Sequence, residues 1–301
     1  MLTIGTRGSH LALWQTNWVA ARLKEAGVES RIEIIKTTGD KITDVALSKA
    51  GGKGLFTKEL EEALIERKID IAVHSLKDMP TALPAGLRLA AVPRREDPRD
   101  AVVGRKLAEL PAGAKVGTSS LRRAAQLRSM RPDLALESIR GNLDTRLRKL
   151  DEGQYDAIVL AAAGLRRLGW HERIAEFLDP RQMCPAVGQG ALAIEAREED
   201  SGVTAACLQL ADQATWQAVT AERALLAALG GGCQVPIGAL GVVGDGELHL
   251  QAVVCAPDGS RTIRREACGQ ASDGARVGRE LAGQLLAAGA NFVLESVYGA
   301  A

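Results

Sequence analysis

One cysteine stands in a run of glycines near the end of the chain and is followed by a proline, in Gly230-Gly231-Gly232-Cys233-Gln234-Val235-Pro236. Successive glycines favour neither helix nor strand, because each adds backbone entropy without a side chain to bury. The preceding helix is therefore predicted to end here and to leave Cys233 on an open loop. Such a thiol could attach a bulky group. The alternative is a buried structural cysteine, a common environment for a free thiol.

Two arginines lie in the first turn of a helix predicted to begin after Gly117-Thr118-Ser119-Ser120. Hydroxyl caps, free backbone N–H groups and the positive end of a helix dipole are typical of an anion site. Without an anion, Arg122 and Arg123 would each cost roughly 0.3–1 kcal/mol at this position. The sequence therefore predicts anion binding. The alternative is that one arginine pairs with a neighbouring carboxylate.

Four further arginines, Arg7, Arg140, Arg146 and Arg167, follow predicted strands or lie near helix ends. Ligands of doubly wound sheets gather beyond the carboxyl ends of the strands. Arginine recognises carboxylates with a planar fork, and 27 of the 38 basic residues are arginine, although a GC-rich genome would also raise that number. Arg146 alone would be interpreted as solvated. As a set, the arginines predict a ligand with several carboxylates or phosphates.

A hydroxyl, a base and an acid follow an apolar strand in Val73-His74-Ser75-Leu76-Lys77-Asp78-Met79-Pro80. Together they form a plausible catalytic set. The alternative for Asp78 is a surface carboxylate beside Lys77. Gly51-Gly52-Lys53-Gly54 also precedes a helix, but it lacks the spacing of a phosphate-binding loop.

The composition excludes several classes of function. The formal net charge is +1 and aromatic residues make up only 3%, so neither nucleic acid nor a membrane surface is an expected partner. No apolar run approaches the length of a membrane span. Five scattered cysteines and four histidines predict neither disulfides nor a metal site. The first residues enter a strand at once, which predicts a cytosolic protein.

Strands and helices alternate over the first two thirds of the chain, which is typical of α/β domains with largely parallel sheets. Strands are predicted at Leu2–Gly5, Arg31–Lys36, Ile69–His74, Leu87–Val92, Lys115–Gly117, Leu134–Ile139 and Asp156–Ala161. Helices are predicted at Leu11–Ala26, Leu55–Arg67, Leu121–Met130, Leu143–Glu152 and Ala163–Leu168. After residue 213 the pattern changes to helix Thr220–Leu229, strands Ile237–Val243, Glu247–Val254 and Arg261–Ala267, and helix Ala275–Ala288.

A short internal echo indicates two similar lobes with a cleft between them. Ile4-Gly5-Thr6 and Val116-Gly117-Thr118 each lead into a helix, and later segments of both lobes repeat a strand after a helix. The charged segment Arg94–Asp100 and the segment Pro185–Gly190 would be the two crossings between the lobes. We expect doubly wound lobes at 1–94 with 191–212 and at 95–190, and a small α+β domain with an antiparallel sheet at 213–301.

Five segments, taken in order, resemble the porphobilinogen deaminase (hydroxymethylbilane synthase) family. They are Val73–Asp78, Gly117–Arg123, Arg140–Asn142, Val187–Gly190 and Gly231–Pro236. The match runs from Ile4 into the third domain without a missing block, and five motifs in register are highly specific. The resemblance implies lobes like those of periplasmic binding proteins.

The resemblance also implies a transferase of tetrapyrrole (heme) biosynthesis. This family joins four porphobilinogen molecules head to tail, with loss of ammonia, into the linear tetrapyrrole hydroxymethylbilane. Its primer is one dipyrromethane cofactor per chain, attached by a thioether to the cysteine that matches Cys233. Each pyrrole ring carries an acetate and a propionate, so the growing chain is a polyanion. That would explain the arginines of a nearly neutral protein.

The matching positions imply roles for individual residues. Asp78 would be catalytic, because it would bind the pyrrole N–H groups and stabilise the cationic azafulvene formed when ammonia leaves. Cofactor binding is implied for Cys233, Ser75, Lys77, Thr118, Ser120, Arg122, Arg123, Arg140 and Gln189. Substrate binding is implied for Arg7, Ser9, Gln15, Lys49, Lys53, Phe56, Arg140, Arg146 and Arg167. One departure is His10, which stands where the family commonly has a proline.

A protein of another class would share the lobes and the arginines. It would close on a small carboxylated ligand without chemistry, and it would need neither Cys233 nor Asp78. Nucleic-acid binding through Arg122 and Arg123 fits poorly with the nearly neutral charge and the few aromatic residues. The expected partner is therefore the small molecule porphobilinogen, and the family suggests a monomer without an obligate protein partner.

Overall fold

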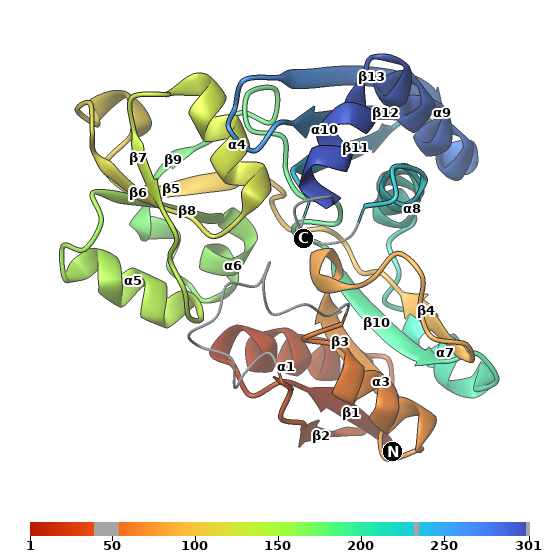
Figure 1. The fold of residues 1–301 in the computed structure, drawn as a ribbon. Helices are drawn as coiled ribbons and strands as arrows, with labels where there is room; N and C mark the ends of the chain where they lie inside the picture. The colour runs from red at the N-terminus through yellow and green to blue at the C-terminus, as the bar shows by residue number, and fades with distance from the viewer. Residues whose placement is uncertain (39–53, 232–234, 299–301) are drawn as a thin grey trace.

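The computed structural model describes residues 1–38, 54–231 and 235–298. Their elements form three bodies (Figure 1): lobe 1 and lobe 2, each a sheet with helices, and a C-terminal unit with its own sheet. Short 3₁₀ helices lie at Leu76–Asp78 (η1), Leu107–Glu109 (η2), His171–Arg173 (η3) and Ala271–Asp273 (η4).

Lobe 1 contains a five-stranded sheet in the order β2-β1-β3-β10-β4. Its strands are β1 (Leu2–Thr6), β2 (Ser30–Ile34), β3 (Ile71–Ser75), β4 (Leu87–Ala91) and β10 (Leu192–Arg197). Its helices are α1 (His10–Glu25), α3 (Lys58–Ile65) and α7 (Ser201–Leu208). Ile4, Ile71 and Ile194 are buried in one cluster with Leu23 of α1, so the apolar strand residues and this helix share a core.

Lobe 2 contains a second five-stranded sheet, in the order β7-β6-β8-β5-β9. Its strands are β5 (Asp100–Gly104), β6 (Lys115–Gly117), β7 (Ala135–Glu137), β8 (Ala157–Ala161) and β9 (Ile174–Phe177). Its helices are α4 (Leu121–Met130), α5 (Leu143–Asp151) and α6 (Ala162–Arg167). Successive residues of β8 pack in different clusters, Val159 with Leu127 of α4 and Ile158 with Leu147 of α5, so both faces of the sheet are covered.

The two lobes have the same strand order. Each repeated half of the chain, β1–β5 and β6–β10, places its last strand in the sheet of the other lobe, and we call β5 and β10 the exchanged strands. β1 and β3 occupy the sheet positions that β6 and β8 occupy in lobe 2, as the internal echo predicted. β5 joins lobe 2 directly after β4 of lobe 1, and β10 returns to lobe 1 after β9.

Both sheets are largely parallel, as the sequence pattern predicted, and each contains one strand that runs in the opposite direction. β10 runs antiparallel to β3 and β4, and β5 runs antiparallel to β8 and β9. Each exchanged strand begins at the carboxyl end of its neighbour, because Asp100 pairs with Ala161 and Leu192 pairs with Ser75. A chain that arrives from the other lobe enters at this edge and must run in the opposite direction.

The sequence prediction missed β5, β9, β10, α7 and α10 (Ala290–Tyr298). β10 is buried along its whole length although it contains Glu195 and Arg197. Both charges have partners inside the protein: the Glu195 Oε2 atom lies 3.1 Å from His74 Nε2, and Arg197 donates to the Leu64 and Ile69 carbonyls at 2.6 and 2.7 Å. The other carboxylate oxygen of Glu195 has no partner among the described residues. Because of these charged residues, the sequence pattern did not predict a buried strand here.

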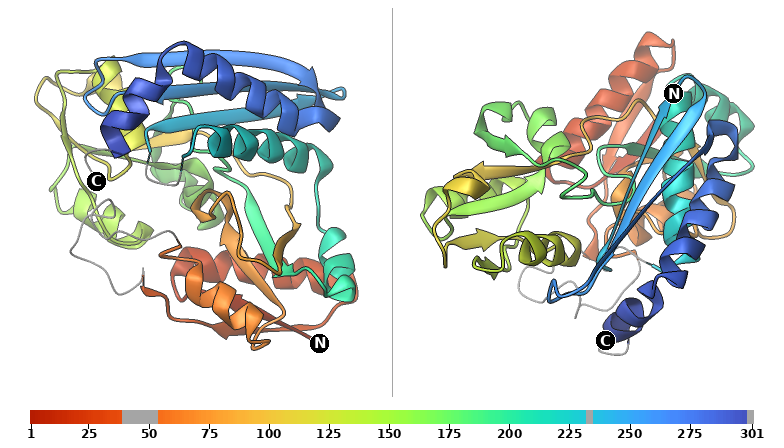
Figure 2. Two further views of the ribbon diagram at one scale, coloured as in Figure 1. Left: turned by 45° about the vertical axis from the view of Figure 1, so that its right-hand side comes forward. Right: turned by 90° about the horizontal axis from the view of Figure 1, so that it is seen from above.

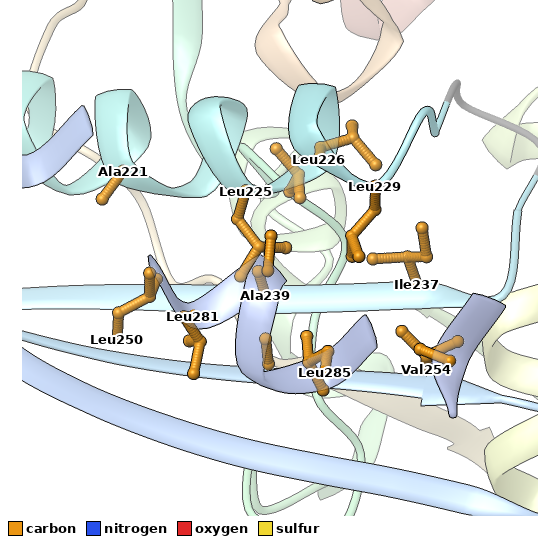
Figure 3. Packing of buried hydrophobic residues seen from close by; sticks show 14 of the residues in the cluster. Ala221, Leu225, Leu226, Leu229, Ile237, Ala239, Leu250, Val254, Leu281 and Leu285 are labelled. Atoms are coloured by element: carbon orange, nitrogen blue, oxygen red, sulfur yellow. The ribbon is translucent and has the colours of Figure 1, made fainter. Parts of the chain in front are cut away.

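The C-terminal unit has an antiparallel sheet of β11 (Ile237–Gly244), β12 (Glu247–Cys255) and β13 (Thr262–Gln270). Helices α8 (Gln213–Ala228) and α9 (Gly274–Ala287) share its apolar core, where Leu225, Leu250 and Leu285 are buried together (Figure 3). The helices approach closely, since a Cβ at Gly278 would lie 2.2 Å from the Ala221 carbonyl oxygen. Figure 2 shows the sheet between α9 and lobe 2.

Candidate active site

The predicted ligand-binding side chains follow strand ends in both lobes. Arg7 follows β1, and Lys77 and Asp78 belong to η1, directly after β3. In lobe 2, Thr118 follows β6 and Arg140 comes after β7. Lys77 and Arg140 line the same cleft, so the strand ends of the two lobes face each other, as expected for doubly wound sheets.

This cleft has a volume of about 530 Å³ and is strongly cationic. We call it the cationic cleft, after the basic residues that line it: Lys77, Arg122, Arg123, Arg128, Arg140 and Arg146. Among its described lining residues, Glu137 is the one carboxylate. Leu226, Val235 and Ile237 of the C-terminal unit form an apolar wall. The cleft thus combines positive charge with a surface suited to flat apolar groups.

Arg122 and Arg123 both pair with one buried carboxylate, Asp100 of β5. The Arg122 Nη1 atom lies 2.6 Å from Asp100 Oδ2, and the Arg123 Nε atom lies 2.9 Å from Asp100 Oδ1. Asp100 is fully buried, and the two guanidinium groups hold its pKa well below the usual value despite that burial. The sequence analysis offered a carboxylate partner for one arginine as the alternative; here one carboxylate serves both.

One buried N–H group at this helix start has no protein partner among the described residues, namely Arg122 Nε. The Ser120 hydroxyl accepts from the Arg123 backbone N–H at 3.4 Å and caps α4. Thr118 Oγ1 in turn accepts from the Ser120 N–H at 3.3 Å. The caps therefore shape the loop, and Arg122 retains hydrogen-bonding capacity.

Burial among like charges lowers the pKa of two basic groups in the cleft. The pKa of Lys77 falls to about 8, mainly through burial and then through the charge of Arg123. The pKa of Arg146 falls to about 10 through burial, with further lowering by Arg123 and Arg140. Asp78 acts on both groups in the opposite direction, which places its carboxylate close to this cluster. The site is therefore short of negative charge.

The loop before α5 orients Arg146 toward its own backbone. The Arg146 Nε atom donates to the Gly141 carbonyl at 2.9 Å, and the Asn142 side chain caps the helix by accepting from the Thr145 N–H at 2.9 Å. Arg140 directly precedes this loop and lines the cleft. Both arginines thus come to the cleft from one short segment.

In lobe 1 the structure pairs predicted substrate residues with one another or with the backbone. Gln15 is buried and donates to the Ser75 hydroxyl at 3.0 Å. The Arg7 guanidinium lies over the Phe56 ring, 4.1 Å from its centroid. The Ser9 hydroxyl accepts from the Ala12 N–H and caps α1.

Gln189 and Arg167 lie at the crossings between the lobes and are not among the residues that line the cleft. Gln189 is fully buried, and its amide nitrogen donates to the Pro98 carbonyl at 2.8 Å and to Asp100 at 2.9 Å. Arg167 donates to the Gly190 carbonyl at 2.7 Å, and burial lowers its pKa to about 10. The structure thus places Gln189 on the second crossing, and Arg167 at the end of α6 in contact with that crossing.

The sequence analysis missed Asp100 and Arg128. Asp100 ends the charged segment predicted to join the lobes, but the structure makes it the first residue of β5, where the apolar run Ala-Val-Val follows it. Arg128 lines the cleft farther along α4, and its Nη1 atom donates to the Pro257 carbonyl at 2.6 Å. Three predicted site residues, Cys233, Lys49 and Lys53, lie outside the described residues.

Fold and site together define a class of two-lobed α/β proteins with a cation-lined cleft and an added C-terminal unit. A periplasmic substrate-binding protein of an ABC transporter from Coxiella burnetii aligns over 69% of this chain and 92% of its own, with 13% identity and a TM-score of 0.44.

Two family models match the chain: "Porphobilinogen deaminase, dipyromethane cofactor binding domain" over residues 2–205, and the C-terminal domain of the same protein over residues 216–287. Porphobilinogen deaminase from Syntrophobacter fumaroxidans is 50% identical, with 100% of this chain and 99% of the relative aligned. The protein of that name from Pelobacter propionicus is 53% identical over 99% and 97%. The chain therefore belongs to the porphobilinogen deaminase family.

Proposed function

We propose that this chain joins four porphobilinogen molecules into hydroxymethylbilane on a dipyrromethane primer carried by Cys233. The observation that carries the proposal is the cationic cleft, whose described lining contains six basic side chains and one carboxylate. Each porphobilinogen unit adds an acetate and a propionate. A growing chain of such units supplies the negative charge that the cleft lacks.

The cleft residues fit dipyrromethane. The buried Arg122 Nε–H has no partner among the described residues, and a carboxylate would supply one. We infer that Lys77, Arg122, Arg123 and Arg140 hold the carboxylates and that Leu226 and Ile237 pack on the rings. When bound, dipyrromethane would supply the free pyrrole carbon to which the first porphobilinogen is added.

The state of the other cysteines supports Cys233 as the attachment point. Cys184, Cys207 and Cys255 are buried, and burial raises the pKa of each thiol, to about 12 for Cys184 and Cys207. A thiol of this kind is inert because the thiolate is the nucleophile. Cys268 is exposed. Val235, two residues after Cys233, lines the cleft.

The covalent attachment can be tested by intact mass. We expect purified wild-type protein to be heavier than its sequence mass by one dipyrromethane, and Cys233→Ser to have the sequence mass. Cys268→Ser is the matched control and should keep the adduct. An active wild-type protein with no added mass would refute attachment at Cys233.

We propose that Asp78 is the catalytic residue for each addition. Its carboxylate would accept hydrogen bonds from the substrate pyrrole N–H and stabilise the positive charge that develops as ammonia leaves. Asp78→Asn should fold normally and lose about 10²–10³-fold in kcat, as is typical when one such group is removed. Asp151→Asn, on the exposed side of α5, should retain full activity. Retention of a tenth of the wild-type rate by Asp78→Asn would exclude the role.

A non-catalytic protein that binds a small carboxylated ligand is the alternative class. It would bind porphobilinogen through the same arginines, and incubation would release no ammonia. Ammonia release in step with porphobilinogen consumption, lost in Asp78→Asn, distinguishes the two classes.

We further infer three domains: residues 1–94 with 191–212, residues 95–190, and residues 213–301 carrying Cys233. Among the described residues, no helix is long and apolar enough to cross a membrane. We propose a cytoplasmic monomer, and light scattering should give a mass close to 31.8 kDa.

A further inference from the structure

The first residue of α1 reaches across to lobe 2. The Nδ1 atom of His10 lies 3.3 Å from Asp144 Oδ1 in the first turn of α5. The His10 ring also meets the Trp170 ring edge-on, with centroids 5.8 Å apart and an interplanar angle of 73°. Both partners belong to lobe 2. One side chain of lobe 1 therefore contacts two separate segments of the other lobe.

Apolar packing beside His10 supports this contact. A Cβ at Gly164 of α6 would lie 3.6 Å from a Leu11 methyl of lobe 1 and 3.6 Å from a Leu143 methyl of lobe 2. Gly164 thus occupies a notch between side chains of the two lobes. We call His10, Leu11, Asp144, Gly164 and Trp170 the lobe bridge.

The lobe bridge lies between two residues for which the family resemblance implies substrate binding. Ser9, the cap of α1, directly precedes His10, and Arg146 comes two residues after Asp144 on α5. A change in the His10–Asp144 separation therefore changes the separation of the substrate groups on the two lobes.

We propose that His10 is a positioning residue, which holds the starts of α1 and α5 at the separation that the polyanionic pyrrole chain requires. This inference rests on the proposed function. Because His10 and Asp144 are 58% and 44% exposed, their contact is weak enough to open and re-form when the lobes move.

The contact between His10 and Asp144 is the polar part of the bridge. Asp144 is the charged group in contact with His10. The other charged side chains on α5, on α6 and in the turn after it have partners of their own. Three donate to backbone carbonyls: Arg146 to Gly141, Lys149 to Arg140 and Arg167 to Gly190. The others form ion pairs: Arg148 with Glu152, Asp151 with Arg173, Arg166 with Glu96, and His171 with Glu172. Among the described residues of these segments, Asp144 is therefore the charge that the His10 ring meets.

The first test measures substrate affinity. His10→Pro keeps the helix, because proline is tolerated at the first helical position, and it removes both contacts. We expect His10→Pro and Asp144→Asn to raise the KM for porphobilinogen about two- to tenfold, with kcat within about twofold of wild type. His10→Gln should fall between them and wild type. His249→Gln, an exposed histidine of β12, is the matched control and should change neither constant.

The second test reads the contact without activity. Because the His10 ring lies against the Trp170 indole, we expect the tryptophan emission of His10→Gln to differ from that of wild type. In a Trp170→Phe background, the same His10→Gln substitution should leave the emission unchanged.

The two measurements separate the outcomes. A tryptophan emission that His10→Gln leaves unchanged, or an unchanged KM in a folded His10→Pro protein, would overturn the positioning role while leaving the proposed function intact. Failure of the wild type itself to consume porphobilinogen would overturn the proposed function and with it this role.

Discussion

Arg122 and Arg123 illustrate how a buried carboxylate changes the role of arginines at a helix start. Asp100 neutralises one of their two charges and fixes both guanidinium planes through bidentate contacts. The pair therefore retains one net positive charge in a defined geometry. Local sequence could indicate the anion site, but it could not identify Asp100, because that contact spans 22 residues and depends on how β5 enters the sheet.

Lys77 gives the cleft a pH dependence within the working range. Because its pKa is lowered to about 8, the ammonium loses its proton and its attraction for carboxylates as the pH rises through that value. We expect the kcat/KM of wild type to fall about tenfold between about pH 7 and pH 9.5, since a hydrogen bond to a charged group contributes roughly 1.5 kcal/mol or more.

Lys77→Arg is the matched variant for this effect, because a guanidinium stays charged over the whole range. Its kcat/KM should be lower than that of wild type near neutral pH and nearly constant with rising pH. If kcat/KM fell equally with rising pH in wild type and in Lys77→Arg, the ionisation would belong to another group.

At the scale of elements, helix and strand bounds were predicted best where the sequence contains both a start signal and a stop signal. Helix α4 begins and ends at the predicted residues, Leu121 and Met130, because Ser120 caps it and the Arg131-Pro132 pair follows it. The missed β5 and β10 depend on partners that are distant in sequence. Likewise, nothing near Gln189 indicates that its amide is fully used by the protein rather than by a ligand.

Gly190 is where the two crossing segments touch. Its φ is +87°, and a Cβ there would lie 2.4 Å from the Glu96 carbonyl oxygen of the other crossing. We expect Gly190→Ala to lower the free energy of unfolding by more than the roughly 1–2 kcal/mol that the left-handed backbone alone costs, because the crossings must move apart. Urea denaturation measures the change.

Gly86→Ala is the matched control, since Gly86 has a similar φ of +83° and nothing within 4 Å of the added Cβ. It reports the backbone cost without the clash. Equal losses in both variants would show that the close approach of the crossings contributes nothing to stability.

At the scale of the whole molecule, Glu222 of α8 joins the C-terminal unit to both crossings. Its carboxylate accepts from Arg95 on the first crossing at 2.5 Å and from the Gly188 N–H on the second at 2.7 Å. It also accepts from the Gly241 N–H of β11 at 2.8 Å. The unit proposed to carry the primer is thus fixed to the segments about which the lobes would turn.

Removing the charge of Glu222 should weaken its contacts with both crossings and with β11, and so lower the stability of the whole protein. Glu222→Gln leaves the Arg95 guanidinium, of which only 10% is exposed, without its counter-ion, so we expect a loss of about 3–5 kcal/mol in the free energy of unfolding. Glu280→Gln breaks an exposed pair with Arg276 and should cost less than about 1 kcal/mol. Thermal or urea unfolding compares the variants, and similar small losses in both would argue against a joint at Glu222.

The exchange of strands has a consequence for synthesis. During translation, every strand of lobe 2 has been synthesised once Phe177 is added. Lobe 1 still has a gap between β3 and β4 at that moment, and the gap is filled only when Leu192–Arg197 follows. The earlier half of the gene therefore encodes the lobe that is completed later, and no single contiguous fragment contains all five strands of lobe 1 without also containing lobe 2.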